Sequence, residues 1–135
     1  MAHVGPPDMR HAIGYALHWP DRGDVPVDRL DLSKIGSLTF REPETARYPA
    51  LAIARDVMEA GGLSGAVFNA AKEATLDGFI ARNIGFMDMA PVVSETLNKM
   101  SSHRGLQNVR FTLDDVLEID KEARAIAGEI ITARS

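Results

Sequence analysis

The stretch SGAVFNAAKEATLDGFIAR, residues Ser64–Arg82, predicts a long amphipathic helix around which the rest of the chain is arranged. Its apolar residues recur at spacings of three and four, which places them on one face of a helix. The expected buried residues are Val67, Phe68, Ala71, Ala74, Phe79 and Ile80. Asn83 and Gly85 are expected to end the helix, because both residue types favour helix termini.

One further helix is expected before this stretch and one after it. One follows Pro49, which suits a first helical position, and stops at Gly61. The other is capped by Asp88 and tolerates Pro91, because the first turn of a helix needs no amide donor there. The expected apolar stripes are Leu51, Ala54, Val57 and Met58 in the first, and Met89, Val92, Val93, Leu97 and Met100 in the second.

A fourth helix opens with Thr112 and Asp115, a variant of the capping box with Asp in place of Glu. Its apolar stripe consists of Leu113, Val116, Leu117, Ala123, Ile126, Ala127, Ile130 and Ile131. Four amphipathic helices joined by short loops predict a four-helix bundle over residues 37–135.

The first 36 residues are rich in proline and glycine and predict a connector. Within it, a helix is expected over Met9–Leu17, capped by Asp8 and stopped by Trp19-Pro20. The alternating apolar residues Val25, Val27, Leu30, Leu32 and Ile35 predict extended chain with at most a short strand. The expected fold is therefore mainly α, an extended connector with one short helix followed by a bundle.

The amino-acid composition argues against several classes of partner. A chain of 135 residues with 45% apolar content can bury the core of one ordinary domain. Its net charge of -4, with both signs spread along the length, offers no positive stripe, so neither nucleic acid nor a membrane is an expected partner. Cysteine is absent, and neither an apolar run of spanning length nor a secretory leader is visible, so the cytoplasm is the expected location.

Asn69, Lys72 and Glu73 are the residues whose spacing best suits chemistry. At separations of three and four on a helix, their amide, amine and carboxylate could meet one substrate and transfer protons. The simpler interpretation, which we favour, is that Lys72 and Glu73 are solvated while Asn69 tethers a neighbouring loop.

Histidines and methionines offer weaker candidates. His11 and His18 share a helix face with Tyr15, and with Asp8 they could ligate zinc. We do not expect a zinc site, because Trp19 interrupts the helix beside His18 and no further cluster completes four ligands. The methionines Met58, Met87, Met89 and Met100 are expected to fill the core.

A series of short motifs carries a family resemblance. In chain order they are Gly5-Pro6-Pro7-Asp8-Met9-Arg10, Leu30-Asp31-Leu32, Ile35-Gly36-Ser37-Leu38-Thr39-Phe40, Arg47-Tyr48-Pro49, Asn69-Ala70-Ala71-Lys72-Glu73, Ile84-Gly85-Phe86-Met87-Asp88-Met89 and Leu113-Asp114-Asp115-Val116-Leu117. The series resembles the C-terminal part of the 1-deoxy-D-xylulose 5-phosphate reductoisomerase family. The likeness runs from Met1 to about Ala127 and matches about the last third of a full member.

The resemblance implies an NADPH-dependent enzyme of isoprenoid synthesis that also uses a divalent metal, magnesium or manganese. It implies that residues 1–36 are a remnant of the central catalytic domain and linker, and that the metal-binding acidic residues lie upstream. Met9 is implied to approach the nicotinamide ring, and no catalytic or metal-binding residue is implied in this chain. The family usually has Asn at the position of Lys72, and a Thr-Pro pair where this chain has His11-Ala12.

The expected function is therefore architectural. The bundle would brace the catalytic domain of a reductoisomerase, with the remainder of that chain or a homodimer as partner, and the chain alone would be inactive. The alternative is an autonomous four-helix interaction module without catalytic activity. A self-sufficient enzyme built on Asn69, Lys72 and Glu73 is the least favoured hypothesis.

Overall fold

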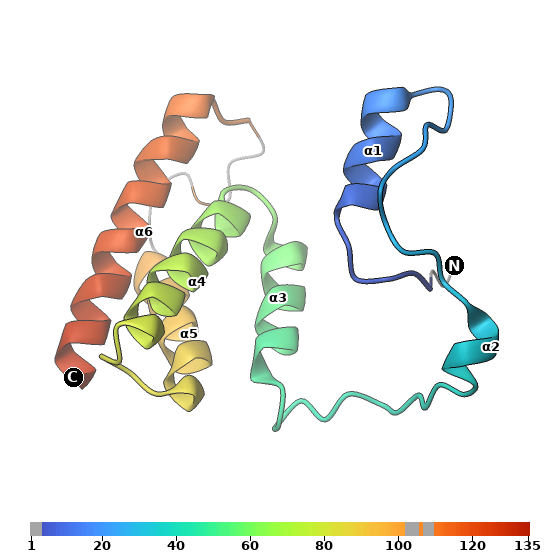
Figure 1. Ribbon diagram of the computed structural model, residues 1–135. Coiled ribbons are helices and arrows are strands. Elements are labelled where there is room, and N and C mark those ends of the chain that lie inside the picture. The colour runs from blue at the N-terminus through green and yellow to red at the C-terminus, as the bar shows by residue number, and fades with distance from the viewer. Residues whose placement is uncertain (1–3, 102–105, 107–109) are drawn as a thin grey trace. The chain divides into compact units, whose positions relative to one another are not determined.

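The computed structural model describes residues 4–101, 106 and 110–135, and the chain divides into two compact units, Met1–Glu42 and Pro43–Ser135 (Figure 1). Over these described ranges, all regular structure is helical, with six α-helices and one 3₁₀ turn. The mainly α class is therefore confirmed. The assignment of residues 1–36 to a catalytic-domain remnant stays a prediction.

The first unit contains α1 (Arg10–His18) and α2 (Leu32–Ile35). Helix α1 ends before Trp19 as predicted, and the Asp8 carboxylate accepts a hydrogen bond from the Arg10 backbone amide at 2.9 Å. Gly14 is the buried residue of α1, and a Cβ atom there would collide with the side chain of Val25. The missing side chain lets the segment around Val25 pack directly on the helix.

Helix α2 corrects the prediction of extended chain at Leu32 and Ile35. The Asp31 carboxylate accepts hydrogen bonds from the backbone amide of Ser33 at 3.0 Å and from its hydroxyl at 2.5 Å. Gly36, with a φ of 69°, ends the turn. These local stop and start signals outweigh the alternation of apolar residues, which is the weaker determinant over so few positions.

The second unit is a bundle of α3 (Pro49–Ala60), α4 (Ser64–Ile80), α5 (Met89–Met100) and α6 (Leu113–Arg134), with the 3₁₀ turn η1 (Phe86–Asp88) before α5. Helix α4 packs against α3, α5 and α6, and α5 also packs against α6 (Figure 1). The predicted four-helix bundle is confirmed, with the quoted stretch as its central helix.

Most helix ends of the bundle follow the expected signals. Helix α4 is an exception, because it ends at Ile80 and the left-handed φ of 64° falls on Arg82 and not on the predicted Asn83 or Gly85. Thr112 and Asp115 form the capping box of α6: the Asp115 carboxylate accepts from the Thr112 amide at 2.7 Å, and the Thr112 hydroxyl accepts from the Asp115 amide at 3.2 Å. Gly61, with a φ of 65°, ends α3. Asp88 precedes α5 as predicted, but its carboxylate accepts from the Gly85 amide at 2.9 Å and makes no cap bond to α5.

Two apolar clusters form the core of the bundle. One joins the start of α4, the end of α5 and the first half of α6, and the other joins the start of α5 to the end of α6. Their buried members are Leu63, Val67, Ala70, Met100, Leu106, Ile119 and Ala123 in the first, and Ile84, Val92, Ala127, Ile130 and Ile131 in the second. At the first cluster, the Leu63 amide donates to the Leu106 carbonyl at 2.8 Å and ties two loops together.

Several residues predicted to be buried are exposed instead. They are Leu51, Met58, Phe79, Ile80, Met87, Leu113 and Leu117. In α4 the face turned inward carries small residues, including Ala70, Ala71 and Gly78, so the bulky Phe79 and Ile80 lie outside it. A Cβ atom on Gly78 would lie 3.1 Å from Ile131 of α6, which shows how closely the two helices approach.

Candidate functional site

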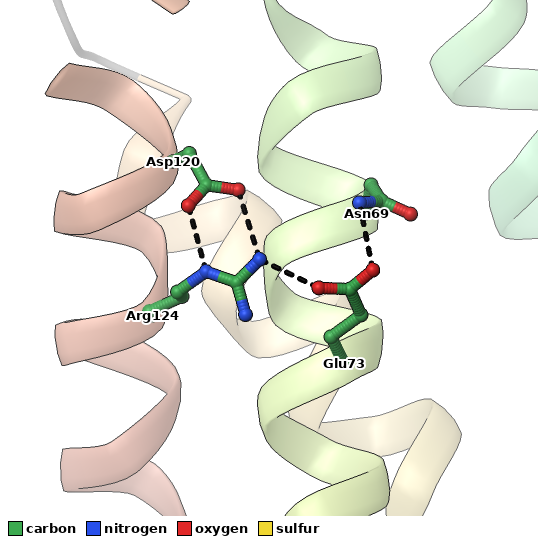
Figure 2. A network of polar contacts seen from close by, with 4 residues as sticks. All are labelled: Asn69, Glu73, Asp120 and Arg124. Atoms are coloured by element: carbon green, nitrogen blue, oxygen red, sulfur yellow. Dashed lines mark hydrogen bonds and ion pairs between the residues drawn. The ribbon is translucent and has the colours of Figure 1, made fainter. Parts of the chain in front are cut away.

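A polar network joins α4 to α6 and contains two of the three residues singled out from the sequence (Figure 2). Asn69 and Glu73 lie one turn apart on α4, and the Asn69 amide donates to the Glu73 carboxylate at 3.2 Å. The guanidinium of Arg124, on α6, donates through Nη2 to the other Glu73 oxygen at 2.6 Å. Glu73 therefore accepts hydrogen bonds from both helices.

Arg124 is held on its own helix by Asp120. Its Nε donates to Asp120 Oδ2 at 2.7 Å and its Nη2 to Oδ1 at 3.1 Å, which is a bidentate arrangement (Figure 2). A planar guanidinium bound by two atoms is preorganised, so it can hold a second carboxylate at little further entropic cost. The result is an ionic clamp between α4 and α6, which we define as Asn69, Glu73, Asp120 and Arg124.

The electrostatics of this ionic clamp favour its charged forms. Hydrogen bonding from Arg124, and then from Asn69, lowers the pKa of Glu73 below its ordinary value. Hydrogen bonds to Asp120 and Glu73 raise the pKa of Arg124. At neutral pH Glu73 is therefore ionised and only accepts hydrogen bonds, so the arrangement suits a cross-link between helices and not proton transfer.

Lys72 is not part of the ionic clamp. It lines a groove together with residues of α3 and α5, while Asn69 and Glu73 bond to each other. The less favoured idea, that the three residues meet one substrate, stays a hypothesis. The simpler interpretation needs correction, because Glu73 is half exposed but paired with Arg124, and Asn69 bonds to Glu73 and not to a loop. Lys72 is exposed, as that interpretation expected.

Asp120 and Arg124 were not among the residues predicted from the sequence. Their signal was available, because an acidic residue four positions before an arginine on a predicted helix is a stabilising pair. Its extension to Glu73 was not available, since 51 residues separate Glu73 from Arg124 in the chain.

The groove beside Lys72 has a volume of about 820 Å³ and lies within the bundle unit. It is bounded by the residues around the start of α3, the middle of α4, and η1 with the start of α5. Its large apolar side chains are Leu51, Ile53, Phe68, Phe86, Met87, Met89 and Val93. Its charged lining residues are both cationic, Arg47 and Lys72.

The first unit holds Met9 and the histidines. Met9 lies immediately before α1 and is 72% exposed, so its thioether is accessible to a ligand. His11 and Tyr15 line a hollow of about 300 Å³ closed by residues between Arg22 and Arg29. The His18 Nδ1 lies 2.7 Å from the Gly14 carbonyl, which occupies that nitrogen within the helix.

The described part of the chain was predicted to hold neither a metal site nor a membrane span. There, no three His, Cys, Asp or Glu side chains are grouped so that they could hold a metal ion. None of the helices in the described ranges is both long enough and apolar enough to cross a membrane.

Comparison with known proteins covers nearly the whole chain. The family model for the DXP reductoisomerase C-terminal domain matches residues 4–126. A 1-deoxy-D-xylulose 5-phosphate reductoisomerase of Jannaschia sp. (strain CCS1) is 63% identical over 127 residues, which are 94% of this chain and 32% of that protein. The corresponding protein of Ruegeria sp. (strain TM1040) is 54% identical over 135 residues, covering 100% of this chain and 34% of its own length.

Solved structures give the same result. The reductoisomerase of Zymomonas mobilis in complex with NADPH has a TM-score of 0.78 and 37% identity, covering 97% of this chain and 33% of that one. A DOX-P reductoisomerase in complex with NADPH, fosmidomycin and magnesium has a TM-score of 0.75 and 32% identity, covering 96% of this chain and 33% of that one. This chain thus spans about a third of the length of the relatives it matches. It belongs to the DXP reductoisomerase C-terminal domain family.

Proposed function

We propose that this chain is the C-terminal structural domain of an NADPH-dependent reductoisomerase that forms 2-C-methyl-D-erythritol 4-phosphate from 1-deoxy-D-xylulose 5-phosphate, in isoprenoid synthesis. The observation that carries the proposal is the 63% identity to a reductoisomerase over 94% of the chain. The matched part is only 32% of that relative, so the bundle contributes to a larger enzyme.

The role of the bundle in this enzyme is architectural. Its most developed polar feature, the ionic clamp, fastens α4 to α6 and leaves no proton to transfer at neutral pH. A rigid support matters to catalysis, because displacing reacting groups by about 1 Å can cost roughly a hundredfold in rate.

Met9 is the residue that we assign to the cofactor. The solved relatives named above bind NADPH, and one also binds magnesium. The exposed thioether at the start of α1 suits contact with the face of a nicotinamide ring. The described residues do not provide a set of ligands for magnesium or manganese, so the metal would be held by the remainder of the enzyme.

The partners in this proposal are the remainder of the reductoisomerase chain and a second copy of the whole enzyme. Its location is the cytoplasm, where a sequence without cysteine needs no oxidising compartment.

Two assays test the proposal. The purified chain, incubated with 1-deoxy-D-xylulose 5-phosphate, NADPH and magnesium or manganese, should oxidise no NADPH above a buffer blank. A chimera, in which this chain replaces the matching third of the Jannaschia enzyme, should be active within about tenfold of the parent in kcat/KM. The Jannaschia enzyme without that third is the control and should be inactive.

The outcomes separate the alternatives clearly. Turnover by the chain alone would show a self-sufficient enzyme. A chimera that is folded and inactive would remove the chain from the reductoisomerase and favour an autonomous interaction module.

A further inference from the structure

The groove of the bundle exposes large apolar side chains that the core of the bundle does not use. Phe86 and Met87 are 70% and 78% exposed, and Tyr48 and Leu51 are about half exposed. None of the four belongs to either core cluster. Apolar side chains gathered in a groove, with solvent over them, mark a surface that another molecule covers.

The charges around the groove indicate the chemistry of that molecule. The chain as a whole is acidic, with a net charge of -4, yet the charged residues that line the groove are Arg47 and Lys72. Arg47 stacks over the ring of Tyr48, 5.6 Å from its centroid, and neither cation forms an ion pair with a carboxylate among the described residues. A carboxylate on the covering molecule would complement both.

The length of the matched proteins indicates where that molecule comes from. The curated relatives extend over about three times the length of this chain, and the family places the bundle at the C-terminal end of them. In a full-length enzyme, the upstream two thirds of the same polypeptide are therefore available to cover the groove.

We propose that this groove is the docking surface for the upstream two thirds of the reductoisomerase. A segment of that part fills the groove with apolar side chains and places a carboxylate beside Arg47 and Lys72. This proposal rests on the proposed function and names the surface through which the bundle braces the enzyme.

Methionine oxidation tests the contact without relying on activity. Met87 lines the groove and is 78% exposed, whereas Met58 does not line it and is 74% exposed, so the two form a matched pair. In the isolated chain, hydrogen peroxide should oxidise both at similar rates. In the chimera with the Jannaschia enzyme, oxidation of Met87 should slow by about tenfold relative to Met58, because thioether oxidation follows exposure.

Substitutions give a second, independent measurement. Met87→Asp should leave the unfolding transition of the isolated chain unchanged and lower the kcat/KM of the chimera by about tenfold to a hundredfold. Met58→Asp is the control and should be neutral in both. Lys72→Glu should weaken the chimera, with Lys121→Glu on the exposed surface of α6 as its control.

The results also separate this proposal from the proposed function. An active chimera in which Met87 oxidises as fast as Met58, and Met87→Asp is neutral, would overturn the docking surface and leave the function standing. An inactive chimera would refute the function first. If sedimentation shows that the isolated chain is a dimer that Met87→Asp dissociates, the occupant is a second copy and the proposal is wrong.

Discussion

At the scale of single residues, Arg124 joins two helices of the bundle. Its guanidinium binds Asp120 on its own helix and Glu73 on α4, so one side chain satisfies two carboxylates. Asn69 completes the arrangement by donating to the second oxygen of Glu73. Because every member is charged or bonded to a charged partner, the arrangement responds to pH.

Replacing Glu73 by Gln should flatten the acid dependence of stability. Since Arg124 lowers the pKa of Glu73 in the folded state, the folded chain prefers the ionised form. That preference stabilises the fold above the ordinary glutamate pKa of 4.5 and is lost as the pH falls through the lowered value. Urea unfolding midpoints, measured from pH 7 downward, should fall less in Glu73→Gln than in the parent chain.

The other carboxylates with a lowered pKa serve as the internal reference for this experiment. Glu95, bonded to Arg134, and Asp115, bonded to Thr112, titrate in both proteins and should leave a common residual slope. Superimposable pH profiles for Glu73→Gln and the parent would show that the ionic clamp does not contribute to stability in solution.

At the scale of elements, the spacing between α4 and α6 is set by small residues. Gly78 of α4 lies against Ile131 of α6, whereas a Cβ atom on Gly128 of α6 would enter open space. Both glycines lie inside helices, where Ala is preferred over Gly. The two positions therefore separate the cost of crowding from the gain in helix propensity.

Gly128→Ala should raise the free energy of unfolding by about 0.5–1 kcal/mol, the usual gain for Gly to Ala inside a helix. Gly78→Ala should gain less, because its Cβ would lie 3.1 Å from Ile131. Gly78→Val should lose roughly 1–3 kcal/mol by overpacking. Chemical denaturation of the three variants decides the matter, and equal gains for both alanine variants would contradict the close approach of the helices.

The helices also show which structural features the sequence patterns predict. The Thr112 capping box and the glycine that ends α3 are local signals, so the bounds of these helices were predictable. The face that each helix buries was harder to predict. Helix α4 buries Ala71 as expected, but it exposes Phe79. Periodicity marks an apolar stripe but does not determine which part of it the neighbouring helices cover.

The candidate site was predictable only in part for the same reason. Asn69 and Glu73 were found by their spacing on one helix, while Arg124 comes from a helix far along the chain. The groove depends on Met87 remaining exposed, and methionine is ordinarily a core residue. Both features arise from packing between helices, which a single sequence does not specify.

At the scale of the whole molecule, the described core lies in the bundle unit. Residues 43–135 include all four long helices, the Thr112 cap and both core clusters. The first unit contains only the short helices α1 and α2, with Leu17 and Trp19 largely exposed. We therefore expect the stability of the chain to be concentrated in the second unit.

Deleting residues 1–42 should leave a helical protein that melts cooperatively, because an independent core is what defines a folding unit. Circular dichroism against temperature is the measurement, with the full chain as reference. The melting temperature should change by only a few degrees. A coil spectrum for the deletion would show that the first unit belongs to the core of the bundle.

The ionic clamp also bears on how the bundle acquires its fold in time. Glu73 and Arg124 are 51 residues apart in sequence, and closing a loop of that length costs entropy before any contact repays it. Helices form from local contacts much faster than such distant segments meet. We expect the pairing of α4 with α6 to be the slow event of folding. Helix α5 should form first, because its formation shortens the flexible chain between α4 and α6.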